Sequence, residues 1–137
     1  MKISFIIIAL LSIAWTTSYS LNEPNIQKRK KHLVKNVSLE DLVVNKAKYH
    51  GQIIQTQGYF FERFEERAVY SDNKITNNRN PKAAVWIQFS ANAKRRFNFD
   101  SLSTKYITIR GIVDTTKKGH VGAYPCSLFN ADLIDFK

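Results

Sequence analysis

The residues of this chain that are best suited to chemistry are aromatic and basic side chains, and they point to binding. Tyr59, Trp86 and Arg110 each stand on the outward side of a stretch in which alternate residues are apolar. Aromatic rings can stack on bases or sugars, and cationic groups can hold phosphates. The pattern predicts an exposed binding surface. The alternative is that the aromatic residues lie beneath a helix or a long loop.

A basic, glycine-containing loop, 115–122, is expected beside that surface. Its segment Gly119-His120-Val121-Gly122 resembles the GXXG clamp of the KH domain, although here it joins two predicted strands. Solvated lysines without a function are the alternative for this loop. The candidate ligand-binding residues are Tyr59, Tyr70, Trp86, Arg110, Lys117, Lys118, His120 and Tyr124.

The sequence does not favour catalysis. Glu62, Glu65 and Glu66 stand among Arg63 and Arg67 in a predicted turn, where we expect the charges to neutralise one another. No phosphate-binding glycine loop, dinucleotide-binding pattern or nucleophile elbow occurs. We therefore expect a protein that is not an enzyme, with a hydrolase that lacks a recognisable motif as an alternative.

The histidines and the cysteine are too scattered to predict a metal site. His32, His50 and His120 come from separate segments, whereas zinc sites use clustered His and Cys. We expect neither a metal nor another cofactor. Because Cys126 is the only cysteine, no internal disulfide can form. We expect it to be a small buried side chain, with pairing between chains or a reactive thiol as the alternatives.

Residues 1–20 have the pattern of a secretory signal peptide. Lys2 precedes an apolar run from Ile3 to Trp15, and small or polar residues follow as far as Ser20. The run is shorter than the roughly 20 residues that a spanning helix needs. We therefore expect a periplasmic or secreted protein whose mature chain has no membrane span. An uncleaved anchor is the alternative.

Residues 21–36 are predicted to form a basic, flexible arm. The formal net charge of the chain is +10, and about half of the excess lies in this segment. The arm could contact nucleic acid, anionic lipid or an acidic partner, or it could be a solvated leader. Its charged residues are Lys28, Arg29, Lys30, Lys31 and Lys35, opposed by Glu23.

Residues 37–137 predict one mainly β domain. A short amphipathic helix is expected from Leu39 to about Lys46, and the segment 90–102 has no clear assignment. Gly58 and Gly111 lie inside strands, as in tightly curled barrels. We expect a five-stranded OB-fold (Greek-key) barrel with a short N-terminal helix; a β-sandwich, with about seven strands, is the alternative. The expected strands are 52–61, 68–71, 83–89, 105–114 and 124–136, with the last interrupted near Asn130 and a loop over 72–82.

Several short segments resemble a family of small exported bacterial proteins of unknown function. They include Tyr49-His50-Gly51, Gly58-Tyr59-Phe60, Val69-Tyr70-Ser71, Ala84-Val85-Trp86 and the run Lys118 to Tyr124. The resemblance implies a single OB-fold barrel without an assigned activity. More distantly, the chain is similar to the periplasmic bacterial OB-fold family linked to stress tolerance. The basic arm and the polar insertion 72–82 depart from the pattern.

These observations predict a non-catalytic exported binding or interaction module. Its partner would be an unknown ligand or an envelope or extracellular protein. The alternative is a single-stranded nucleic-acid-binding protein that uses the arm and the exposed aromatic residues. We expect Tyr70, Trp86, His120 and Tyr124 to line a shared groove.

Overall fold

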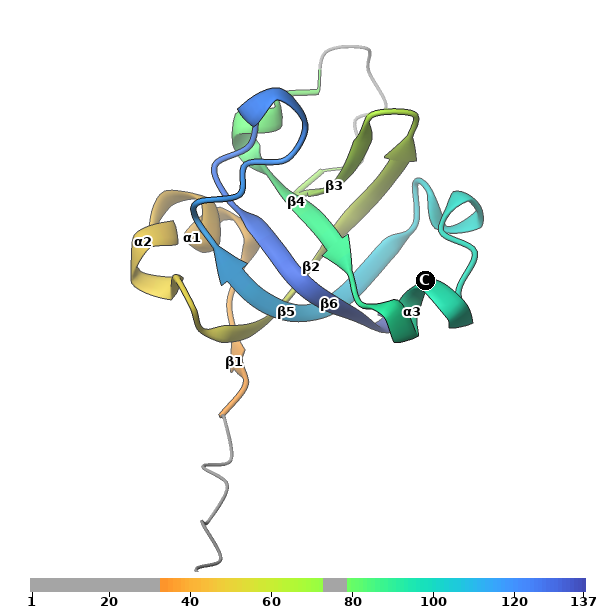
Figure 1. The fold of residues 1–137 in the computed structure, drawn as a ribbon, viewed down its shortest axis with the longest axis horizontal. Coiled ribbons are helices and arrows are strands. Elements are labelled where there is room, and N and C mark those ends of the chain that lie inside the picture. The colour runs from red at the N-terminus through yellow and green to blue at the C-terminus, as the bar shows by residue number, and fades with distance from the viewer. Residues whose placement is uncertain (1–32, 73–78) are drawn as a thin grey trace, which may run out of the picture. The chain divides into compact units, whose positions relative to one another are not determined.

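The fold is mainly β, and the strands of the described residues form one six-stranded sheet (Figure 1). The structure is a computed structural model and describes residues 33–72 and 79–137. The predicted signal peptide and most of the basic arm lie outside the described residues, as does the middle of the loop over 72–82. The strands are β1 (Lys35–Asn36), β2 (Ile53–Arg63), β3 (Glu66–Tyr70), β4 (Ala84–Phe89), β5 (Tyr106–Asp114) and β6 (Ser127–Phe136).

Pairing between the strands runs around a partial barrel-like ring. β2 is antiparallel to β3, and β3 to β4; β4 runs parallel to β6. β6 is antiparallel to β5, which returns to pair with β2. The contact between β3 and β4 is short, because only residues 68–70 are in register with 84–86. One continuous sheet does not agree with the alternative of a β-sandwich.

β1 is a sixth strand that we did not predict. Lys35 and Asn36 pair in parallel with Ile54 and Gln55 of β2, and the N–H of Val37 donates to the Gln55 carbonyl at 2.9 Å. The prediction of a flexible arm over residues 21–36 is therefore wrong for Lys35 and Asn36. These backbone hydrogen bonds place Lys35 and Asn36 in the sheet.

The alternating residues of the strands meet in one core, as their spacing predicted. Ile54 and Phe60 of β2, and Ile107 and Ile109 of β5, are fully buried. Each such side chain contributes about 1.5–3 kcal/mol when it leaves water. Cys126 is also buried there, and desolvation raises the pKa of its thiol to about 11. This placement agrees with the prediction of a small buried side chain.

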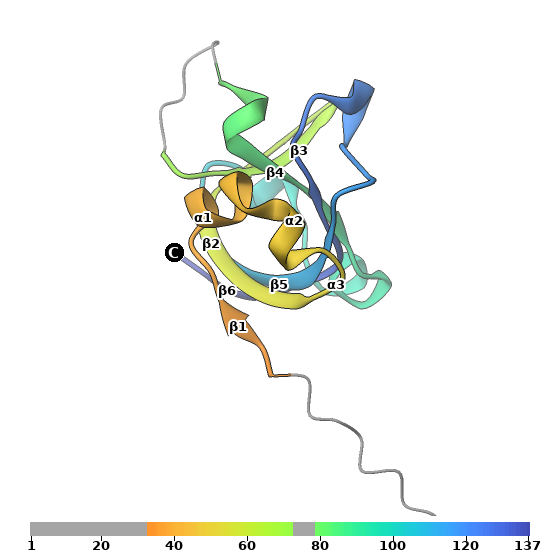
Figure 2. The ribbon, with the colours of Figure 1, turned by 90° about the vertical axis from the view of Figure 1, so that its left-hand side faces the viewer.

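Short helices lie at the ends of the ring. The helices are α1 (Leu39–Val44), α2 (Lys46–Tyr49) and α3 (Ala91–Arg96). Figure 2 shows α1 and α2 in front of one opening, and Figure 1 shows α3 at the other end of the strands. The Ser38 hydroxyl accepts from the N–H of Asp41 at 3.1 Å and so caps α1. The single helix that we predicted divides at Asn45, whose φ of −106° is not helical.

Two loop boundaries also differ from the prediction. β3 begins at Glu66 rather than Ala68, because pairing with β2 continues to Arg63 and leaves Phe64 and Glu65 as the turn. The segment 90–102 forms α3 and a 3₁₀ turn. β6 begins at Ser127, and its predicted irregularity appears at Asn130, where φ is +49° and the register with β5 shifts.

Within residues 33–72 and 79–137, no helix is long and apolar enough to cross a membrane.

Candidate ligand-binding groove

A second apolar cluster covers the outer side of β2, β3 and β4. Tyr70 and Tyr124 are buried in it, whereas Tyr59 and Trp86 are partly buried. The ring centroids of Trp86 and Tyr124 are 5.2 Å apart. The fold thus gathers four of the eight candidate residues. Phe61 is buried in the same cluster. Much of this face is therefore covered, in agreement with the alternative that the aromatic residues lie beneath other parts of the chain.

Gly119 lets the loop between β5 and β6 rest on this cluster. Its φ is +66°, and a Cβ atom would lie 2.6 Å from Trp86 Cδ2 and 2.7 Å from Tyr124 Cδ2. Any larger residue would have to displace one of the two rings. Val121, two residues on, also has a positive φ of +47° and is 85% exposed. A β-branched residue is strained in this conformation, and such strain is concentrated at functional loops.

A basic groove of about 460 Å³ lies beside Trp86, on β4. The amino group of Lys117 is 3.9 Å from the Asp114 carboxylate and 4.3 Å from the ring centroid of Phe129, and the side chain remains half exposed. Lys118 is exposed as well. The groove therefore combines an indole with exposed cationic groups. Its lining residues are Arg67, Trp86, Ile87, Gln88, Lys94, Lys117, Lys118, Gly119 and Ser127.

Two basic residues of this lining were missed as site residues by the sequence analysis. Arg67 was assigned to a neutralised turn, and its guanidinium does donate to both Glu62 carboxylate oxygens, at 2.7 and 2.5 Å. Lys94 lies on α3, in the segment without an assignment. The sequence carries a signal for this helix. Ser90 caps the start of α3, and three basic residues occupy the last turn of the helix.

A smaller cavity of about 180 Å³ adjoins Tyr70 and Tyr124 of the cluster and is also lined by Glu66, Arg79 and Pro81. Arg79 donates to both carboxylate oxygens of Glu66, at 2.9 and 2.5 Å, and the Tyr70 hydroxyl donates to Glu66 at 2.7 Å. Arg79 also stacks over the Phe61 ring, 4.2 Å from its centroid. Burial raises the pKa of Tyr70 and of Tyr124. Because its polar groups satisfy one another, this network is structural.

The Glu66 network predicts a stability that depends on pH. The hydrogen bonds from Arg79 hold the pKa of Glu66 below its ordinary value of 4.5, and the bond from Tyr70 acts in the same direction. A lowered pKa stabilises the fold above pH 4.5, and this contribution is lost as the pH falls through the folded-state pKa. We expect Glu66→Gln to be less stable by about 1–2 kcal/mol at neutral pH and to lose less stability than the wild type on acidification. Urea unfolding between neutral pH and pH 3 checks this; parallel profiles would contradict it.

The structure does not place the remaining candidates in either cavity. His120 Nε2 lies 3.1 Å from Glu65 Oε2, and both side chains are exposed. Arg110 lies on β5, opposite Gln55 of β2 and Asp132 of β6. Tyr59 packs edge-on against Tyr106 at 5.0 Å. The expected groove of Tyr70, Trp86, His120 and Tyr124 is thus divided, with Trp86 on its basic side.

Each of the three glutamates at the turn between β2 and β3 has a basic partner. Glu62, Glu65 and Glu66 face Arg67, His120 and Arg79 respectively. In the part of the chain that the structure describes, no three His, Cys, Asp or Glu side chains come together as a metal site requires.

Comparisons of the chain with protein-family models, with curated proteins and with solved structures found no match.

Proposed function

We propose that the protein is an exported, non-catalytic binding module of the OB-fold kind, and that it binds an anionic ligand in the basic groove beside Trp86. The observation that carries the proposal is the indole of Trp86 bordered by the exposed Lys94, Lys117 and Lys118. Cations around an aromatic ring suit a ligand that has both negative charge and a flat or apolar part. Export rests on the signal-like sequence of residues 1–20.

The order of strand pairing supports the OB-fold part of the proposal. Five strands, β2 to β6, pair in a ring in which β6 lies between β4 and β5, and α3 connects β4 to β5. Partly open barrels of this fold bind through their second and third strands and the loops that join strands one to two and four to five. In this chain those elements correspond to β3, β4, the turn at Phe64 and the loop 115–126. The basic groove adjoins β4 and that last loop.

A single-stranded nucleic acid is the more specific candidate for the anion. It would place phosphates on the lysines and a base against Trp86, which is partly buried and so offers only part of its surface. A base-free polyanion would use the lysines alone. The two cases therefore differ in their dependence on the indole.

Binding of a labelled single-stranded oligonucleotide and of linear polyphosphate of matched charge tests the proposal. We expect affinity to fall steeply with salt for both probes, because phosphate contacts release counterions. If a base stacks on Trp86, then Trp86→Leu should weaken oligonucleotide binding about tenfold and leave polyphosphate binding unchanged. Equal loss for both probes would contradict nucleic-acid recognition.

The basic arm needs its own control. A chain that begins at residue 33 removes most of the arm's charge and keeps β1, whose pairing with β2 would be lost in a deletion through residue 36. Binding that vanishes with the arm but survives Lys117→Ala/Lys118→Ala would overturn the groove as the site. No binding of either anion would overturn the proposal.

A further inference from the structure

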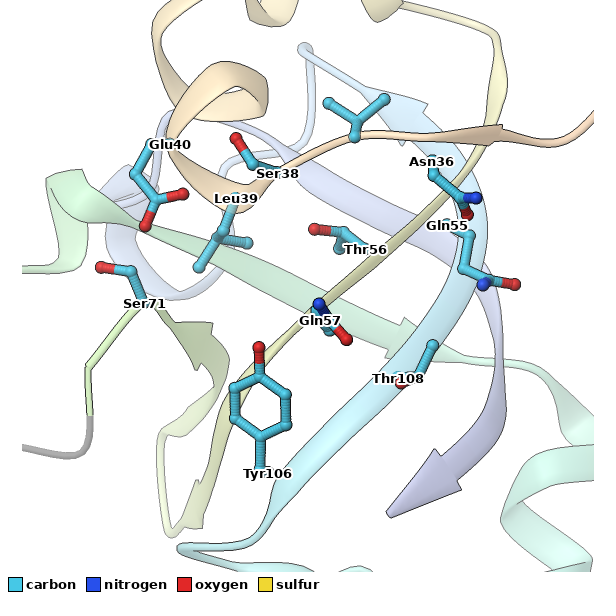
Figure 3. Close-up of a pocket in the computed structure, with 11 residues that line it drawn as sticks. Asn36, Ser38, Leu39, Glu40, Gln55, Thr56, Gln57, Ser71, Tyr106 and Thr108 are labelled. Atoms are coloured by element: carbon cyan, nitrogen blue, oxygen red, sulfur yellow. The ribbon is translucent and has the colours of Figure 1, made fainter. Parts of the chain in front are cut away.

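A pocket of about 540 Å³ lies on another part of the barrel, between the segment 36–40 and strands β2 and β5 (Figure 3). Its volume falls within the roughly 300–1,000 Å³ typical of small-ligand sites. The register places Asn36 beside Gln55 and Gln57 beside Thr108. One wall of the pocket is therefore built on paired strands, while Ser38 and Ser71 line it from outside the strands.

The hydrogen-bonding groups of the pocket are almost all neutral. Asn36, Gln55 and Gln57 contribute amides, and hydroxyl groups come from Ser38, Ser71, Tyr106 and Thr108. Glu40 is its one charged lining residue. A carboxylate disfavours anions, so this pocket differs in kind from the basic groove. Amides and hydroxyls both donate and accept, as a ligand rich in hydroxyl groups requires.

Thr56 is the residue that points to a ligand. It lines the pocket, its side chain is 3% exposed, and its Oγ1 has no hydrogen-bond partner within the described part of the protein. Figure 3 shows Ser38, Ser71 and Tyr106 around Thr56 and Gln57. Leaving a buried hydroxyl unsatisfied costs stability, and valine would fill the same space in a strand without that cost. A polar partner in the pocket would account for the hydroxyl.

We propose that this pocket binds a neutral sugar, either a monosaccharide or the end of a neutral oligosaccharide. Along β2, Thr56 faces inward and Gln55 and Gln57 face outward. A sugar at the edge of the strand would bond the Gln57 amide on one side and give Thr56 Oγ1 the partner that it lacks on the other. Tyr106, partly buried and braced edge-on by Tyr59 at 5.0 Å, supplies a ring against which the C–H face of a sugar can pack. The site is independent of the anion groove.

Titration of the full chain with neutral disaccharides of glucose, galactose, mannose and N-acetylglucosamine, followed by calorimetry and amide NMR shifts, tests the proposal. We expect at least one sugar to bind, with shifts centred on Gln55–Gln57 and little change in affinity with salt. Thr56→Val and Gln57→Ala should each weaken binding about three- to tenfold. Gln57 is exposed, so its variant tests the site even if Thr56→Val does not fold.

Lys117→Ala/Lys118→Ala is the matched control, because it alters the basic groove alone. It should leave sugar binding unchanged, whereas Thr56→Val should leave binding of polyphosphate unchanged. The proposal is overturned if none of the sugars binds, or if sugar affinity is the same in the wild type and both pocket variants. If Thr56→Val destabilises the protein and the wild type binds none of the sugars, the partner of the Thr56 hydroxyl is instead a buried water.

Discussion

Replacing Gly58 by alanine should destabilise the protein by about 3 kcal/mol, the largest effect that we expect from one added methyl group. A Cβ atom at this position would lie 2.5 Å from the Tyr70 carbonyl oxygen and 2.6 Å from Val69 Cγ1. Both neighbouring atoms belong to β3, whose backbone pairs with β2 and cannot move without breaking that pairing. Urea unfolding monitored by tryptophan fluorescence measures the change in stability.

Gly111→Ala is the matched control for this prediction. Gly111 also lies within a strand and faces inward, but its added Cβ would lie 3.1 Å from the Phe129 carbonyl oxygen and 3.2 Å from Ala131 Cβ. A shift of a few tenths of an ångström relieves such close approaches, so we expect destabilisation by about 1 kcal/mol. Equal destabilisation in the two variants would show that the close approach of β3 is not the reason why Gly58 cannot be replaced by alanine.

Removing two lysines of the basic groove should produce the largest effect on function. Each charge-assisted hydrogen bond at an exposed site is worth roughly 1–2 kcal/mol, so Lys117→Ala/Lys118→Ala should weaken polyphosphate binding by at least about 30-fold. With a single-stranded oligonucleotide, the slope of log affinity against log salt should also decrease by about 0.7 for each phosphate that the protein no longer neutralises. Fluorescence anisotropy across a salt series gives both quantities. Lys117 is held only weakly by Asp114, so the fold should survive the change.

The control is a second pair of lysines away from the groove. Lys82 and Lys105 are exposed, and Lys82→Ala/Lys105→Ala removes the same charge. This variant should bind nearly as tightly as the wild type if the groove is the site. If both double variants bind equally weakly, the protein attracts anions by its net charge alone.

The inward sides of the strands were predictable from the sequence. Val85, Ile87 and Phe89 alternate with polar or small residues, and all three are buried. This succeeded because the two-residue period of a strand is a local property. The helix predicted from Leu39 likewise begins at that residue, directly after Ser38 caps it, since a capping bond spans only three residues.

The candidate site was only partly predictable. Trp86, Lys117 and Lys118 were singled out from their residue types, and the structure brings them to one groove. Arg110 was grouped with them because it faces outward, but an outward direction alone does not specify on which side of the barrel-like ring a residue lies. Lys94 was missed because its helix lies far from the loop 115–122 in the sequence.

The sequence by itself determined which residues face the core, approximately where β2 to β6 lie and that the chain is strongly basic. Only the tertiary structure decided that Gly119 rests on Trp86, that Arg79 neutralises Glu66 and that Thr56 lacks a partner within the described residues. The physical reason is that patterning acts between neighbours along the chain. These arrangements depend on contacts between segments more than ten residues apart, which local patterns do not encode.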